Sequence, residues 1–200
     1  MALQRVAIAV LATPRNTSAV WRLQQQACGL AAMWLQNPAT RVVPDLTFAQ
    51  VIPGTAWGGA IIDYSYSWMM QHTLDSLHTL LTSNGGCSDP TLRPAVLQWT
   101  ANFSLWLNTS YWGAVVMMHS NNHITAYHAL SAHLCLFRGD IDCALMLLTR
   151  ARDILLPNQV LPTGEQPFET IRGDGISYSL QNLRTFLQMA TMAGNTQCMA

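Results

Sequence analysis

Residues 18–36 read SAVWRLQQQACGLAAMWLQ, and this stretch has the pattern of an amphipathic helix. Its apolar side chains recur every three or four residues, which places them on one face of an α-helix. The positions are Val20, Leu23, Ala27, Leu30, Ala31 and Trp34. Pro38 follows closely, and a proline disfavours the helical conformation at the residue before it. We therefore expect the first clear helix to end near Gln36.

Similar signals continue along the chain, whereas strand patterns are sparse. Further helices are predicted at about 67–82, 89–107, 121–139, 140–155 and 176–193. Asp89-Pro90 is a helix start signal, Gly139 a glycine cap, and Pro157 and Gly194 are expected stops. Six helices in three antiparallel pairs predict an all-α fold, either a bundle or a layered or toroidal array. Residues 37–65 form an unusually long connection, which we interpret as functional.

The composition excludes several classes of protein. Charged residues make up 10% of the 200 residues and the formal net charge is zero, so no basic surplus points to nucleic acid. No apolar run is long enough to span a membrane. All ten positive residues are arginines. Without a lysine, neither a pyridoxal-phosphate Schiff base nor a P-loop can be built. We expect no cofactor and no metal.

The five cysteines contain no CxxC motif. We interpret them as buried small apolar residues, although Cys135 and Cys143 could be bridged. Glycosylation sequons begin at Asn16, Asn102 and Asn108 and give weak support for a secretory route. The apolar residues 1–12 could be a short signal core, but we favour a helix interior.

Three stretches concentrate residues with chemical potential. Ser120–His123 lies at a predicted helix start, where backbone donors attract anions; a simple helix cap is the alternative. Residues 164–178 contain both glutamates of the chain together with an arginine and a tyrosine, although they could form a solvated loop. Residues 48–63 combine glycines with Trp57, which suits a sugar platform or a buried connection.

Together these stretches resemble the alginate lyase family of polysaccharide lyases, which has a helical toroid fold. The matching blocks are WLQNPATR at 34–41, FAQ at 48–50 with IPG at 52–54, GAIID at 59–63, WLNTS at 106–110, NNH at 121–123, VLPTGEQPFE at 160–169, and the stretch from Arg172 to Ser179 with QNL at 181–183. The resemblance implies an incomplete toroid in a single domain over 1–200. By comparison with the family pattern, the domain is expected to be truncated at the N-terminus and could be truncated at the C-terminus as well.

The resemblance implies β-elimination on alginate or a related polyuronate, in a secreted or periplasmic protein. The substrate would be an acidic polysaccharide, with no nucleic acid, membrane span or metal involved. The implied catalytic residues are Asn122, His123, Arg172 and Tyr178. Gln50, Trp57, Asn121, Tyr127 and Glu169 are expected to contact sugar or support the site. The chain departs from the family pattern at Asp174, Ser177 and His128.

The implied reaction removes the C5 proton of a uronate and breaks the bond to O4. Asn122, His123 and Arg172 have the chemistry to neutralise the carboxylate beside C5. Tyr178 is the candidate base and acid, because a nearby cation would favour its phenolate. His123 is the alternative base. Two other functions stay open: an inactive carbohydrate-binding remnant of the fold, and a helical protein-interaction domain.

Overall fold

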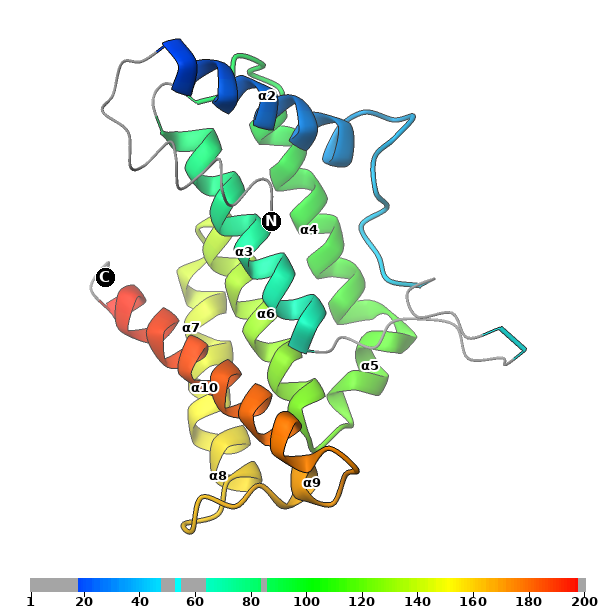
Figure 1. Ribbon diagram of the computed structural model, residues 1–200, viewed down its shortest axis with the longest axis vertical. Coiled ribbons are helices and arrows are strands. Elements are labelled where there is room, and N and C mark those ends of the chain that lie inside the picture. The colour runs from blue at the N-terminus through cyan, green and yellow to red at the C-terminus, as the bar shows by residue number, and fades with distance from the viewer. Residues whose placement is uncertain (1–17, 48–52, 55–63, 84–85, 198–200) are drawn as a thin grey trace. The chain divides into compact units, whose positions relative to one another are not determined.

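The computed structural model describes residues 18–47, 53–54, 64–83 and 86–197, and its regular elements are all helices (Figure 1). Their bounds are α2 (Ser18–Leu35), α3 (Tyr64–Thr82), α4 (Leu92–Thr109), α5 (Tyr111–Met117), α6 (Asn122–Arg138), α7 (Ile141–Arg150), the π-helix η1 (Ala151–Leu155), α8 (Leu156–Gln159), α9 (Pro167–Thr170) and α10 (Gly175–Gln197). No strand occurs within these described ranges, so the all-α prediction is confirmed.

The predicted helix stops differ from the observed ones for local reasons. The chain passes Pro157 through the wide π-turn η1, and Pro157 lies in the first turn of α8, where its missing N–H costs little. Helix α10 continues past Gly194 to Gln197, since a helical glycine costs only about 1 kcal/mol. The short helices α5 and α9 were not predicted, because four to seven residues carry almost no periodic signal.

Contacts divide the chain into two units, 1–44 with 70–103 and 45–69 with 104–200. In the first unit, the fully buried Gln24 of α2 ties down the end of α3. Its amide nitrogen donates to the carbonyl oxygens of Leu80, Ser83 and Gly86 at 2.7–3.2 Å. Carbonyls at a helix C-terminus lack partners within the helix, so this side chain satisfies them.

The second unit is built around α6. Twelve of its seventeen residues are buried, because α5, α7 and α10 all pack against it. Figure 1 shows α10 crossing in front of α6 and α7. The apolar core joins α6, α7, η1 and α10, through Ile124, Ala129, Ala132, Leu148, Ala151, Leu155, Phe186, Met189 and Met192. Gly139 ends α6 in the left-handed conformation, with φ at 78°.

The cysteine interpretation is corrected by two disulfides. Cys28 of α2 is bonded to Cys87, and Cys135 of α6 is bonded to Cys143 of α7. The interpretation of the cysteines as free, buried apolar residues is therefore wrong for these four. The bridge between Cys135 and Cys143, which was the stated alternative, is confirmed. The predicted helix over residues 1–12 lies outside the described residues. Among the described helices, none has both the length and the apolar composition needed to cross a bilayer.

The two disulfides should contribute unequally to stability. The Cys28–Cys87 bond spans 59 residues of chain and the Cys135–Cys143 bond spans 8. Loop-closure entropy then predicts a loss of about 4 kcal/mol for the double serine variant of the first pair and about 2.5 kcal/mol for the second. Urea unfolding of both variants against the unchanged chain measures this. A larger loss for the second pair would contradict it.

His128 of α6 should make the protein less stable in mild acid. The residue is 1% exposed, its Nδ1 lies 2.9 Å from the Ile124 carbonyl oxygen, and burial lowers its pKa below the ordinary 6.5. Below about pH 6.5 the unfolded chain therefore binds a proton that the folded chain does not, and stability falls as the pH falls.

The test compares urea unfolding at pH 7.5 and 5.5. The His128→Phe variant should lose less stability between these values than the unchanged chain, by up to about 1 kcal/mol. Gln98→Phe, at an exposed position that carries no titratable group, is the control and should keep the full pH dependence. The same pH dependence in all three proteins would rule out His128 as its source.

Candidate active site

The first part of the site is the N-terminus of α6. Asn121 is its N-cap residue, and its side-chain oxygen accepts the His123 N–H at 3.2 Å. Asparagine is favoured there because its oxygen satisfies a donor that has no partner within the helix. The alternative reading of Asn121 as a helix cap is therefore correct. The cap also sets the start of the helix, and so positions Asn122 and His123.

Glu169 of α9 joins this helix start to Arg172. Its carboxylate accepts the backbone N–H of Asn122 and, at 2.8 Å, the Nη1 of Arg172. The same Nη1 donates to the side-chain oxygen of Asn122 at 2.8 Å. Glu169 is only 1% exposed, whereas the Arg172 side chain is 26% exposed. A buried carboxylate thus holds an arginine that solvent can still reach.

Tyr178 lies on the other side of the arginine. The Arg172 guanidinium carbon is 3.4 Å from the centroid of the Tyr178 ring, a close cation–π contact. The chain brings them together because Gly175 starts α10 against α9. A Cβ on Gly175 would lie 2.8 Å from the Thr170 Cα and 2.9 Å from the Glu169 carbonyl oxygen. Only glycine fits this close approach.

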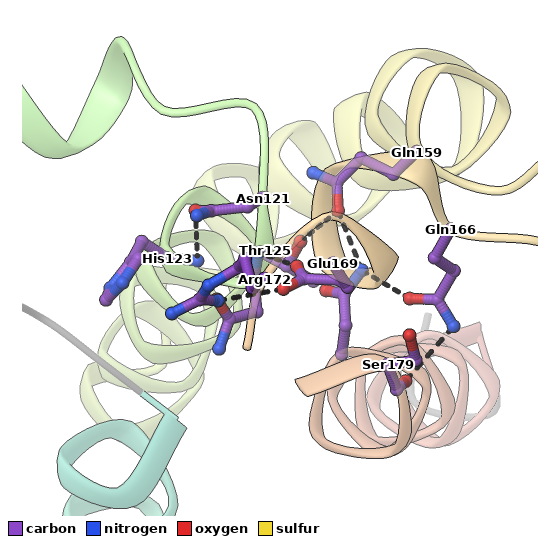
Figure 2. A network of polar contacts seen from close by, with 10 residues as sticks. Asn121, His123, Thr125, Gln159, Gln166, Glu169, Arg172 and Ser179 are labelled. Carbon is purple, nitrogen blue, oxygen red and sulfur yellow. Dashed lines mark hydrogen bonds and ion pairs between the residues drawn. The ribbon is translucent and has the colours of Figure 1, made fainter. Parts of the chain in front are cut away.

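A layer of buried, hydrogen-bonded polar side chains lies beside these residues. The Asn182 amide nitrogen donates to the side-chain oxygens of Gln159 and Gln166, at 2.8 and 2.9 Å. Thr125 also donates to Gln159, and Gln166 donates to the Ser179 carbonyl oxygen. Figure 2 shows this layer beside the Glu169–Arg172 pair. It joins α6, α8, α9 and α10, so the elements that hold the site share one hydrogen-bonded network.

The predicted site residues have different placements. Asn122, Glu169, Arg172 and Tyr178 form one connected group. His123 follows Asn122 directly, is half-buried, and its ring centroid lies 5.1 Å from that of His119. Predictions for Gln50 and Trp57 lie outside the described residues.

Tyr127 is placed away from solvent, at 4% exposure. Its hydroxyl donates to the Leu107 carbonyl oxygen or the Asn108 side-chain oxygen, each at 3.2 Å, and burial raises its pKa. These contacts favour a supporting role over a direct sugar contact.

Sequence reasoning missed the supporting residues Gln159, Gln166, Asn182 and His119. Gln166 and Asn182 lie within the matching blocks at 160–169 and 181–183, and these blocks are the sequence signal for their positions. Gln159 and His119 lie outside every block and had none. Within the described residues, no three His, Cys, Asp or Glu side chains are grouped to hold a metal ion.

The arrangement suits the binding of an anion beside a proton-transferring group. Arg172 uses Nη1 for internal contacts, which leaves Nε and Nη2 to donate to a ligand. Asn122 is 2% exposed and its side-chain oxygen accepts from Arg172, so its amide nitrogen is the group left to donate. It differs in this from Tyr127, whose hydroxyl already has partners. The Tyr178 hydroxyl is the only hydroxyl on a ring in contact with Arg172 among the described residues.

Comparisons with known proteins identify the family and the fold. The family model described as alginate lyase matches residues 3–197. The crystal structure of an alginate lyase from Bacteroides ovatus superimposes with a TM-score of 0.83 at 23% identity, which shows a shared fold. The match covers 96% of this chain and 49% of that one, so the chain spans about half the length of this structural relative. No curated protein sequence matches the chain.

The two glutamates of the chain allow a matched test of whether the contacts of Glu169 with Asn122 and Arg172 stabilise the fold. In Glu169→Gln the amide oxygen can accept from Asn122 or from Arg172 but not from both, and its NH₂ then faces the other donor. We expect the free energy of unfolding to fall by about 1.5–3 kcal/mol. The exposed Glu165→Gln should change it by less than about 0.5 kcal/mol. Equal effects in urea unfolding would show that the Glu169 contacts do not stabilise the fold.

Proposed function

Because this chain belongs to the alginate lyase family, we propose that it is a polysaccharide lyase that cleaves alginate or a related polyuronate by β-elimination. The observation that carries the proposal is the position of Arg172, which contacts Asn122, Glu169 and Tyr178 at once. A guanidinium with uncommitted donors next to a phenol combines the two functions that such a reaction needs: charge neutralisation and proton transfer.

The difficult step is loss of the C5 proton, because the neighbouring carboxylate repels the negative charge that develops. In the proposed complex, the Nε and Nη2 of Arg172 and the amide nitrogen of Asn122 donate to that carboxylate. Donors fixed in advance are effective, since they do not reorganise during the reaction, and each can contribute about 3–4 kcal/mol. Glu169 serves as a positioning residue, because its carboxylate holds both groups in place.

Tyr178 is the proposed base and acid. Its phenolate takes the proton from C5, the electron pair forms the C4–C5 double bond, and the C4–O4 bond breaks. The leaving O4 then takes the proton back from the phenol, so the residue returns to its starting state without a co-reactant. The Arg172 guanidinium lies against the face of the Tyr178 ring, so a positive charge stands close to the proposed base. The products are a shortened chain and an unsaturated uronate.

His123 is proposed to assist at the same carboxylate or to act as the base in place of Tyr178. It follows Asn122 at the start of α6, and its ring lies beside that of His119. An imidazole suits proton transfer near neutral pH. Kinetics separate the two roles: loss of the base removes turnover, whereas loss of a carboxylate donor weakens both binding and turnover.

The two disulfides support a secreted or periplasmic location for the lyase. Disulfides form and persist in oxidising compartments and are rare in reducing ones. Cys28–Cys87 and Cys135–Cys143 lie in different units, so both halves of the chain carry one. An acidic polysaccharide substrate outside the cytoplasm fits this location.

Tyr178→Phe is the direct test of the mechanism. The variant keeps the ring under Arg172 and removes only the hydroxyl, so it should fold normally. We expect turnover to fall by about 10²–10⁴-fold. Alginate and glucuronan are incubated with each protein, and the ultraviolet absorbance of the unsaturated uronate is followed.

Tyr111→Phe is the matched control, since Tyr111 is 72% exposed and lies outside the site. It should keep full activity. If the folded, unchanged chain releases no unsaturated product from any polyuronate, the lyase proposal fails. Binding without cleavage would then indicate an inactive carbohydrate-binding protein, and neither binding nor cleavage would favour a helical interaction domain.

A further inference from the structure

A pocket of about 270 Å³ lies between the first turns of α3 and the middle of α10. It is lined by Trp68, Arg184, Leu187, Gln188 and Thr191, all within the second unit. The four residues from α10 are spaced at i, i+3, i+4 and i+7, so they share one face of that helix. Trp68 of α3 provides the facing aromatic wall.

This pocket is separate from the Arg172–Tyr178 pair. Arg184 follows Tyr178 by six residues, which is about 9 Å along a helix axis. Six residues also turn the helix by about 240°, so the two side chains leave α10 on different faces. None of the residues that contact Arg172 lines the pocket.

The pocket has the chemistry of an acidic-sugar site. Arg184 is exposed and forms no ion pair with a carboxylate of the described residues, in a chain with only ten positive side chains. Trp68 is 40% exposed, and an aromatic face attracts the polarised C–H groups of a sugar ring. The buried Oε1 of Gln188 accepts no hydrogen bond from a described residue. A donor from a ligand would remove the cost of that unpaired oxygen.

We propose that this pocket is a second binding site, which holds one uronate residue of the polysaccharide away from the reacting bond. The inference rests on the proposed function, because it assigns a further part of the same substrate to this chain. Arg184 binds the carboxylate and Trp68 packs against the ring. Gln188 Oε1 accepts a hydrogen bond from a sugar hydroxyl, and so does the Thr191 hydroxyl oxygen, whose own proton is donated to the Leu187 carbonyl. An unpaired guanidinium favours an anionic sugar over a neutral one.

The first test measures binding without turnover. In the Tyr178→Phe background, isothermal titration calorimetry with alginate and glucuronan oligosaccharides gives the Kd. Adding Arg184→Gln should raise the Kd by roughly tenfold or more, since a hydrogen bond to a charged group is lost. Arg93→Gln is the charge-matched control, because Arg93 is exposed and lies outside the pocket. It should leave the Kd unchanged.

The second test separates binding from chemistry in the chain with Tyr178 intact. Arg184→Gln should raise KM and leave kcat within about twofold, as expected when an interaction is equally strong in the ground and transition states. Arg184→Lys should restore part of the affinity. Binding of the oligosaccharide should quench tryptophan fluorescence, and Trp68→Phe should reduce this quenching.

The outcomes distinguish this inference from the proposed function. If the oligosaccharides bind and are cleaved but Arg184→Gln and Arg93→Gln behave alike, the pocket is not a uronate site and the lyase proposal stands. If Arg184→Gln lowers kcat at unchanged KM, the residue acts on the reaction, which also overturns the inference. If no polyuronate binds to the folded chain, both proposals fail.

Discussion

The site depends on one buried carboxylate. Glu169 is 1% exposed and accepts hydrogen bonds from the Asn122 backbone and the Arg172 guanidinium. A buried charge is tolerated only when it is paired and hydrogen-bonded, so Glu169 requires both partners to stay in place. That requirement joins the start of α6 to the α9–α10 turn. Glu169 is one of only two glutamates in the chain, and it is the buried one.

The second unit also contains a layer of polar side chains beside this pair. Thr125, Gln159, Gln166 and Asn182 are all buried and connected by hydrogen bonds. Each side-chain amide offers directional bonds, so the layer specifies how α6, α8, α9 and α10 approach one another. Apolar packing between α6, α7 and α10 supplies the non-directional part of the stability.

Sequence reasoning predicted the helices well where periodic apolar residues extend over several turns. The helix predicted over 18–36 is observed as α2, which ends at Leu35. Its predicted apolar face was only partly right, because Ala27 and Ala31 are buried whereas Leu23, Leu30 and Trp34 are 46–60% exposed. The predictions failed for contacts between residues that are far apart in the sequence, because such contacts depend on the tertiary structure. The pairing of Cys28 with Cys87 cannot be read from spacing, because it depends on how a distant loop returns to α2. The role of Glu169 likewise depends on a contact with Asn122, 47 residues away.

The resemblance identified Asn122, Glu169, Arg172 and Tyr178, but it could not show which of them contacts which. The Nη1 of Arg172 donates hydrogen bonds to Asn122 and Glu169, and the flat face of its guanidinium packs on the Tyr178 ring. A guanidinium can do both because its donors lie in its plane while its charge also acts through its face. A lysine at this position would offer a single charged point, and could hold the carboxylate or the ring but not both in this geometry. Arginine therefore suits this position, where one cation contacts an acid, an amide and a phenol.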